Sequence, residues 1–189
     1  MQPQTDPPIL HQGLLWVLGE AQRVGALGSS PLFEIIRHAS WFADAIPSDA
    51  REVVDLGSGA GVPGLIVAVV RPELRVTLVD RRQKRVDALI RAITLLDMGE
   101  RVAAVCADVD KIRIEMPWRG KFDAAISRGF GPPLQTLTWS AQLVRPGGVV
   151  VISEPPNQEL DRWDGVDLTA IGVVGPTRVG PLAVFHVEH

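Results

Sequence analysis

A cluster of glycines directly after an apolar run places the strongest constraint on the fold of this chain. The run at residues 53–56 leads into four glycines, which are Gly57, Gly59, Gly61 and Gly64. An apolar run that ends in a glycine-rich turn and continues into a second apolar stretch is typical of a strand–loop–helix unit. Glycine permits the sharp turn and lets a ligand approach the backbone closely. The stretch therefore predicts a buried strand whose carboxyl end holds a ligand.

The loop allows two interpretations, which predict different cofactors. Read from Gly59, the pattern Gly59-x-Gly61-x-x-Gly64 has the spacing of a dinucleotide-binding turn, where a helix N-terminus holds a pyrophosphate. Read from Asp55, a carboxylate precedes the glycines. That carboxylate suits the amino group and sulfonium of S-adenosylmethionine and opposes a pyrophosphate. The position of Asp55 therefore favours S-adenosylmethionine.

Two further acidic residues are expected at the same edge of the sheet. Asp80 and Asp108 each end a strand-like run, and the carboxyl ends of parallel strands share one edge. A carboxylate at Asp80 can accept hydrogen bonds from ribose hydroxyls, and Asp108 can accept one from the adenine amine. Arg81 and Arg82 directly after Asp80 are compatible with a 2′-phosphate, so an NADP-dependent oxidoreductase remains the alternative.

Strand-like and helix-like runs alternate along the chain. Helices are expected at residues 9–26, 31–46, 62–71, 82–97 and 133–144. Strands are expected at residues 52–56, 75–80, 101–107, 122–127 and 149–153, and a final hairpin at residues 166–174 and 181–187. The pattern predicts an α/β fold of the class I methyltransferase, Rossmann-like type. It has a seven-stranded, mostly parallel sheet, an antiparallel C-terminal hairpin and a short N-terminal helical extension.

Composition and charge agree with a single domain. The 189 residues are 46% hydrophobic, which is enough for one sizeable core. We expect a tail and helices at residues 1–47 and one globular methyltransferase domain at residues 48–189. The net charge of −3 argues against nonspecific coating of nucleic acid, but residues 71–128 are more basic than the rest. A basic middle suits a polyanionic substrate, although a solvated, Arg-rich surface has the same composition.

Cysteine and histidine usage bears on location and on metals. The single cysteine, Cys106, cannot form an internal disulfide, and the first ten residues lack the features of a signal peptide. No apolar run is long enough to span a bilayer. We therefore expect a cytoplasmic protein with no membrane contact. The four histidines are scattered, so no metal site is expected.

Several motifs together resemble one protein family. The loop Val54-Asp55-Leu56-Gly57-Ser58-Gly59-Ala60-Gly61-Val62-Pro63-Gly64 closely resembles the cofactor loop of the bacterial 16S rRNA guanine-N7 methyltransferases. This family is also called glucose-inhibited division protein B, or small-subunit rRNA methyltransferase G. The resemblance covers roughly residues 35–152 and continues through Arg37-His38, Arg71-Pro72-Glu73, Thr77-Leu78-Val79-Asp80, Lys84-Arg85 and Ser127-Arg128-Gly129-Phe130.

The resemblance implies a function and a set of site residues. It implies transfer of a methyl group from S-adenosylmethionine to N7 of a guanine, with 16S rRNA or the small ribosomal subunit as partner. The cofactor contacts implied by the resemblance are Gly57, Val62, Asp80, Ala107, Asp108 and Arg128. The loop and the strand ends add Asp55, Ser58, Gly59, Gly61, Arg81 and Val109 to the predicted cofactor contacts. Arg128 is also the implied catalytic residue, because its guanidinium can donate to guanine O6 or hold the carboxylate of the cofactor.

The chain departs from the family pattern on the side expected to hold RNA. Residues 25–30 lack the Asn-Leu-Thr motif of the family, and Glu154-Pro155-Pro156 stands where the family has Lys-Gly. This charge reversal predicts weaker attraction of phosphates. A methyltransferase of another RNA or of a small molecule, or a cofactor-binding protein without turnover, therefore remains an alternative. Trp118 is the expected RNA-contacting aromatic, whereas Trp16 and Trp41 are interpreted as packing residues.

Overall fold

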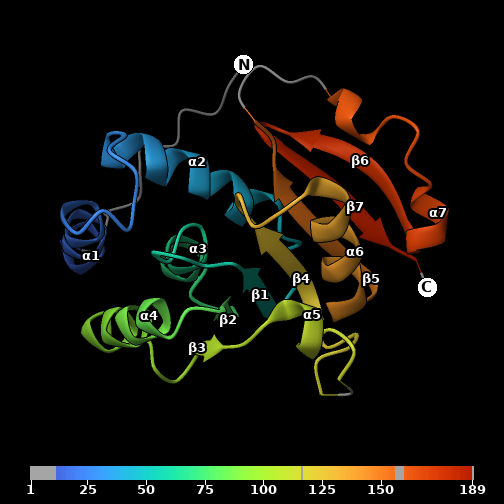
Figure 1. Ribbon diagram of the computed structural model, residues 1–189. Helices are drawn as coiled ribbons and strands as arrows, with labels where there is room; N and C mark the ends of the chain where they lie inside the picture. The colour runs from blue at the N-terminus through green and yellow to red at the C-terminus, as the bar shows by residue number, and fades with distance from the viewer. Residues whose placement is uncertain (1–11, 116, 156–159, 189) are drawn as a thin grey trace.

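The computed structural model describes residues 12–115, 117–155 and 160–188. The strands are β1 Glu52–Leu56, β2 Arg75–Asp80, β3 Val102–Cys106, β4 Phe122–Ser127, β5 Val144–Ser153, β6 Val173–Val179 and β7 Leu182–Val187. The helices are α1 Gln12–Arg23, α2 Leu32–Ala45, α3 Gly64–Val70, α4 Gln83–Leu95, α5 Val109–Ile112, α6 Pro133–Leu143, the 3₁₀ turn η1 Leu160–Trp163 and α7 Leu168–Ile171. Figure 1 shows the helices covering both faces of one twisted sheet.

The sheet has the order β3-β2-β1-β4-β5-β7-β6. Strands β1 to β5 are parallel, and β7 runs antiparallel to both β5 and β6. The predicted seven-stranded, mostly parallel sheet with an antiparallel C-terminal hairpin is therefore confirmed. After β1 the chain moves outward to β2 and β3, and it then returns to place β4 on the other side of β1. Ligands of open α/β sheets bind at the carboxyl ends of the strands beside such a reversal.

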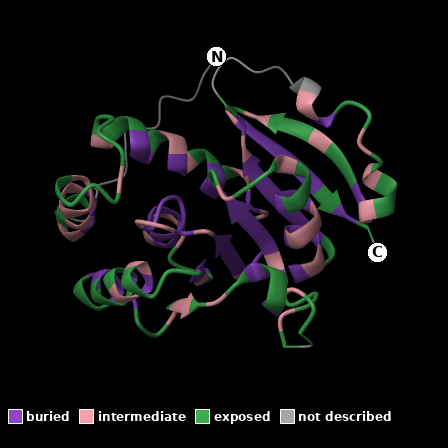
Figure 2. Cartoon of the chain, viewed as in Figure 1, coloured by how far each residue is buried: buried purple, intermediate pink, exposed green. Residues whose placement is uncertain are grey.

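Each face of the sheet has its own core. Val53 of β1 packs into the core beneath α1, α2, α3 and α4, whereas its neighbour Val54 packs into the core beneath α5 and α6. This alternation follows from the two-residue period of a strand. Figure 2 shows buried residues along the central strands and mostly exposed residues on the edge strand β6. Because both faces are covered, a ligand can reach the central strands only at their ends.

Two predicted segments differ from the observed elements. The run at residues 166–174 was expected to be a strand, but Asp167 caps the short helix α7, and β6 then begins at Val173. The predicted strand at residues 149–153 begins earlier, at Val144, so the Pro146-Gly147-Gly148 stretch lies inside β5. The register with β4 shifts between Phe122 and Ala124, which accommodates these residues as an irregularity of the ladder.

The apolar residues of two helices are only partly buried. In α4, Val86, Leu89 and Ile93 are buried, whereas Ile90 is 48% exposed. In α2, Phe33 is exposed, whereas Ile35 and Ile36 are buried. Neither exposed residue interrupts its helix, because tertiary packing decides which part of a broad apolar stripe is covered.

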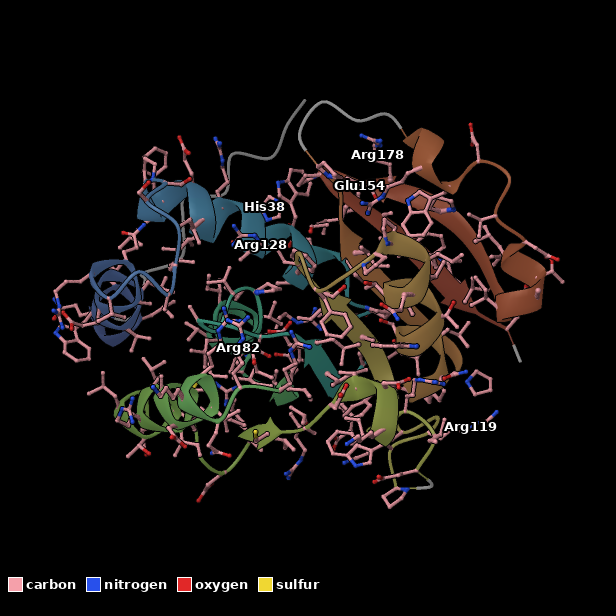
Figure 3. All side chains as sticks on the ribbon, in the orientation of Figure 1. His38, Arg82, Arg119, Arg128, Glu154 and Arg178 are labelled. Carbon is pink, nitrogen blue, oxygen red and sulfur yellow. The ribbon has the colours of Figure 1, made fainter. Side chains whose placement is uncertain are left out.

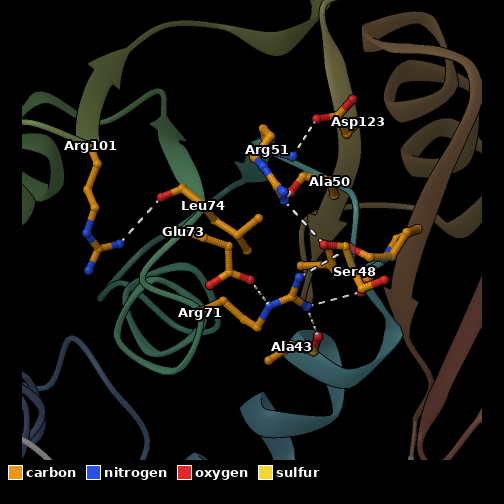
Figure 4. Close-up of polar contacts among 11 residues, drawn as sticks. Ala43, Ser48, Ala50, Arg51, Arg71, Glu73, Leu74, Arg101 and Asp123 are labelled. Carbon is orange, nitrogen blue, oxygen red and sulfur yellow. Dashed lines mark hydrogen bonds and ion pairs between the residues drawn. The ribbon is translucent and has the colours of Figure 1, made fainter.

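Arg71 connects the end of α2 to the loop after α3 (Figure 4). Its guanidinium donates to the carbonyl oxygens of Ala43 at 2.9 Å, Ile46 at 3.1 Å and Pro47 at 3.2 Å, and it pairs with Glu73. The final carbonyls of a helix lack partners inside the helix, so these bonds satisfy groups that would otherwise be unpaired. They tie the N-terminal helices to the sheet across residue 47. A domain division at that residue stays a prediction.

Among the described residues, no helix is both long enough and apolar enough to cross a membrane.

Candidate active site

The carboxyl ends of β1, β2 and β3 are joined by backbone hydrogen bonds. The amides of Gly57 and Ser58 donate to the carbonyl of Val79 at 2.8 and 3.0 Å, and the amide of Ala107 donates to the carbonyl of Asp80 at 3.2 Å. The structure therefore brings together the predicted contacts that follow the first three strands. We call this group the glycine-loop edge, comprising residues 57–61, Asp80, Ala107 and Asp108.

The glycine loop requires its glycines. Gly57, Gly59 and Gly61 have φ angles of +72°, +56° and +88°, which residues with a side chain rarely adopt. A Cβ on Gly59 would meet only ordinary contacts, with the Gly57 carbonyl oxygen 3.7 Å away and Arg85 Nη1 3.8 Å away. The space beside Gly59 is thus open to a ligand, and the chain conformation keeps the backbone accessible there.

Asp55 lies beneath the loop. It is 1% exposed, and its Oδ2 accepts a hydrogen bond at 3.1 Å from the amide of Gly64, the first residue of α3. Its Oδ1 has no hydrogen-bond partner among residues 12–115, 117–155 and 160–188, and burial raises the pKa of this carboxyl to about 7. The observed contact fixes the start of α3 against β1. A direct contact between Asp55 and a cofactor stays a prediction.

Asp80 lies at the end of β2 and organises the loop. Its Oδ2 accepts from the amide of Gly59 at 3.1 Å and from Arg85 Nη1 at 3.3 Å, and its Oδ1 accepts from the amide of Arg82 at 2.9 Å. Two carboxylate oxygens offer about four acceptor positions. One position is therefore left for a ligand, although Asp80 is almost fully buried.

The remaining predicted cofactor contacts occupy different environments. Asp108 is exposed, and its Oδ1 accepts from the amide of Asp110 at 3.2 Å at the start of α5. Its second oxygen has no hydrogen-bond partner among the described residues. Val62 and Val109 have buried side chains that belong to the two cores, so only their backbone can meet a ligand. Arg81 is exposed.

Arg128 follows β4 and lies beside a second group of residues. A cavity of about 400 Å³, the β4–β5 cavity, opens at the ends of β4 and β5 and at the start of α6. Its lining includes His38, Ser127, Arg128, Phe130, Thr136, Glu154 and Arg162. Figure 3 shows His38 and Arg128 close together in the view, with Glu154 farther toward the C-terminal strands. Arg128 is exposed and makes no hydrogen bond or ion pair with a described residue.

Phe130 contacts both the loop and this cavity. A Cβ on Gly57 would lie 2.6 Å from Phe130 Cδ2, so the phenyl ring rests directly against the backbone of Gly57. The same residue lines the β4–β5 cavity and pairs edge-on with Trp139, with ring centroids 6.1 Å apart. Phe130 therefore connects the glycine-loop edge to the cavity.

Several buried polar atoms of the cavity residues have no hydrogen-bond partner in the part of the chain that the structure describes. They are His38 Nδ1, Ser127 Oγ, Thr136 Oγ1, Glu154 Oε2 and Arg162 Nε. Buried polar groups in native proteins are almost always hydrogen-bonded, so such a concentration indicates a place for a ligand or for ordered water. Partial burial, followed by the nearby charge of Arg128, lowers the pKa of His38. The imidazole is therefore neutral near pH 7.

Glu154 is not placed as its sequence position suggested. It was expected to weaken the attraction of phosphates, but its carboxylate is buried and accepts from Arg162 Nη2 at 2.8 Å and from Trp163 Nε1 at 3.0 Å. Its charge is therefore paired within the chain, and weaker attraction of phosphates at this position stays a prediction. Pro155 lines the cavity, whereas Pro156 lies outside the described residues.

A second cavity adjoins the first. This α2 cavity has a volume of about 450 Å³ and is lined by Ser30, Glu34, Ile35, Arg37, His38, Trp41, Arg128 and Pro181. His38 and Arg128 line both cavities, so the two are neighbours. Trp41 was interpreted as a packing residue but is 40% exposed, and Trp16 is 61% exposed. Trp118 is half-buried against Phe122, and its RNA contact stays a prediction.

Sequence reasoning did not single out several of the cavity residues. Phe130 and His38 stood within motifs of the family resemblance, so a signal for them was present. Thr136 and Arg162 have no such signal, because their positions depend on how α6 and η1 pack after β4 and β5. Among the described residues, no cluster of three or more His, Cys, Asp or Glu side chains could hold a metal ion.

Comparison with known proteins identifies the family. A model of the GidB family, described as rRNA small subunit methyltransferase G, matches residues 28–161. Ribosomal RNA small subunit methyltransferase G of Salinispora arenicola is 37% identical over 112 residues, covering 57% of this chain and 45% of that protein. Its namesake from Moorella thermoacetica is 31% identical over 110 residues, covering 58% of this chain and 45% of that protein. The chain thus spans about half the length of these relatives.

Solved structures of low sequence identity share the fold. A transferase structure from Pyrococcus horikoshii has a TM-score of 0.63 at 14% identity, covering 88% of this chain and 67% of that one. An O-methyltransferase family protein from Burkholderia thailandensis has a TM-score of 0.57 at 19% identity, covering 82% of this chain and 57% of that one. These likenesses agree with the class I methyltransferase fold, and the family match favours the S-adenosylmethionine interpretation of the loop over the dinucleotide one. The chain belongs to the GidB family, the family of rRNA small subunit methyltransferase G.

Proposed function

We propose that this protein transfers a methyl group from S-adenosylmethionine to N7 of a guanine in 16S rRNA, in the cytoplasm. The observation that supports this most strongly is the junction of two different sites through Phe130. On one side lies an acidic, glycine-lined edge suited to a nucleoside cofactor. On the other side lies a cavity with polar groups, and the guanidinium of Arg128, that have no partner among the residues that the structure describes. Methyl transfer requires this pairing of a cofactor site and an acceptor site.

The residues of the glycine-loop edge fit S-adenosylmethionine. Asp80 has one acceptor position left for a ribose hydroxyl, and the free Oδ2 of Asp108 can accept from the adenine amine. The backbone is open at Gly59. A carboxylate at the position of Asp80 suits the ribose of either cofactor. The family match is therefore what favours S-adenosylmethionine over NADP, with Arg81 and Arg82 exposed nearby.

The acceptor side fits a reaction that needs no general base. When bound, S-adenosylmethionine supplies an electrophilic methyl group. Guanine N7 carries an in-plane lone pair, so no proton has to leave before attack. The protein therefore needs only to hold N7 in line with the methyl group, which is catalysis by positioning.

Arg128 is the residue that can address both reactants. Its guanidinium has five donors in a fixed fork, and it makes no hydrogen bond with a described residue. We assign it to guanine O6 on the acceptor side, which holds the adjacent N7 in place. The contact with the cofactor carboxylate implied by the family resemblance uses other donors of the same fork.

A labelled methyl group tests the proposal. Small ribosomal subunits from a strain that lacks its own enzyme are incubated with the protein and S-adenosylmethionine labelled on the methyl group. We expect label in 16S rRNA. Calorimetric binding of S-adenosylmethionine without label transfer to any RNA would contradict the proposal and would leave a binding protein or another substrate. Tight binding of NADPH alone would contradict the cofactor assignment as well.

A further inference from the structure

The α2 cavity contains an exposed tryptophan beside the proposed acceptor site. Trp41 is 40% exposed and lines this cavity together with Arg37, His38 and Arg128. The volume of about 450 Å³ lies within the range of about 300–1,000 Å³ that small-ligand sites occupy. His38 and Arg128 also line the β4–β5 cavity, so a chain leaving the acceptor site can pass directly into the α2 cavity.

The indole of Trp41 is supported from one side. A Cβ on Gly180 would lie 2.6, 2.7 and 2.8 Å from Trp41 Cδ2, Cε3 and Cε2, three neighbouring atoms of the fused rings. The β6–β7 turn therefore lies flat against one face of the indole, and only glycine permits this approach. Gly180 also has a φ of +55°, which favours glycine independently. The residue is nevertheless 40% exposed and lines the α2 cavity, which leaves the face away from Gly180 as the one that a base can reach.

The charges around Trp41 suit a nucleotide. Arg37 is exposed and makes no hydrogen bond or ion pair with a described residue, and Arg128 is likewise unpaired among them. Among the described residues that line the cavity, Glu34 is the only acidic one, so these residues carry a net positive charge with His38 neutral. Two free guanidiniums beside an open indole face combine phosphate attraction with base stacking, which is how proteins hold single-stranded nucleic acid.

We propose that the α2 cavity binds the nucleotide adjacent to the target guanine in single-stranded RNA. The base of that nucleotide stacks on the open face of Trp41, and its phosphate pairs with Arg37. This inference rests on the proposed function, because it assumes that the acceptor base enters the β4–β5 cavity. Stacking on an aromatic ring tolerates any base, so the cavity fixes the path of the strand and does not select its sequence.

Binding of a generic RNA tests the inference without any methyl transfer. The probe is a fluorescein-labelled, single-stranded oligoribonucleotide of mixed sequence, and its affinity is measured by anisotropy over a series of salt concentrations. Trp41→Leu is expected to weaken binding between about fivefold and 150-fold, the range for loss of one stacked base, with an unchanged salt slope. Arg37→Gln is expected to reduce the slope of log affinity against log salt by about 0.7, the value for one phosphate of a single strand.

Matched variants control for exposure and charge. Trp16→Leu removes a more exposed tryptophan that does not line the cavity, and Arg75→Gln removes an exposed arginine at the opposite edge of the sheet. Both should bind RNA like the wild type. Gly180→Ala keeps Trp41 but displaces its ring, so it should weaken binding as Trp41→Leu does.

Three outcomes would overturn the inference. They are no RNA binding by the wild type at low salt, equal weakening by Trp16→Leu and Trp41→Leu, and an unchanged salt slope in Arg37→Gln. Failure of the proposed function looks different. In that case label transfer to small subunits is absent, while RNA binding still depends on Trp41 and Arg37.

Discussion

Replacing Asp55 by Asn should remove the pH dependence of stability that this site contributes. The carboxyl is buried, Oδ2 accepts from the Gly64 amide, and Oδ1 has no hydrogen-bond partner among the described residues. Burial raises its pKa from 3.8 to about 7. A raised pKa means that the folded protein keeps a proton that the unfolded chain releases. The stabilising contribution is therefore complete below about pH 4 and is lost as the pH rises to about 7.

The magnitude follows from the size of this shift. One pKa unit corresponds to about 1.4 kcal/mol, so about 4 kcal/mol of the free energy of unfolding is lost between about pH 4 and pH 7. Asparagine has no charge to bury, and its carbonyl can still accept from the Gly64 amide. Its amide group at the position of Oδ1 lacks a partner and costs about 1–3 kcal/mol. Asp55→Asn should therefore be less stable than wild type by about 1–3 kcal/mol at about pH 4 and more stable by a similar amount at about pH 8.

Urea denaturation of both proteins across this pH range measures the difference. Contributions from all other titrating groups cancel when the two free energies of unfolding are subtracted. The difference should change by about 1.4 kcal/mol per pH unit between about pH 4 and pH 7 and should be constant above that range. A difference that does not vary with pH would refute the reasoning, because it would mean that Asp55 ionises at its ordinary pKa in the folded protein.

Three further predictions concern stability, cofactor and catalysis. Arg71→Ala removes the donor to three carbonyls at the end of α2 and should lower the free energy of unfolding by about 1.5–3 kcal/mol in urea denaturation. The control Arg75→Ala, at an exposed arginine, should lower it by less than about 1 kcal/mol. Equal losses in the two variants would contradict the role of Arg71. Asp80→Asn should weaken S-adenosylmethionine binding by about 1–3 kcal/mol in calorimetry, and unchanged affinity would show that this carboxylate does not contact the ribose. Arg128→Met should lower kcat/KM for small subunits by at least about tenfold with an unchanged melting temperature, and retention of full activity would exclude Arg128 from the reaction.

The sequence was sufficient to predict the sheet because its signals are local. Strands β1 to β4 are apolar runs with clear boundaries, and the glycines mark the turn at the end of β1. The predicted C-terminal hairpin exists, but its first strand begins later in the sequence than expected. Residues 166–174 are apolar enough for a strand, whereas the side chain of Asp167 caps a helix by accepting from the Ala170 amide. A side-chain cap of this kind overrides a weak strand propensity.

The cofactor edge was more predictable than the acceptor side. Asp80 and Asp108 follow strands, so their common edge follows from parallel topology alone. By contrast, the environment of Glu154 depends on Arg162 and Trp163, which lie eight and nine residues later in the sequence. The exposure of Trp41 likewise depends on Gly180, far away in the sequence. Contacts of this kind depend on tertiary packing, and no periodicity or spacing encodes them.

The identity of the methylated nucleoside tests the central claim most directly. Small ribosomal subunits from a strain that lacks its own enzyme are incubated with the protein and labelled S-adenosylmethionine, and the 16S rRNA is digested to nucleosides. The account predicts that the label is found in 7-methylguanosine and that Arg128→Met reduces its amount. Label in another nucleoside, or no label from a protein that binds the cofactor, would contradict it.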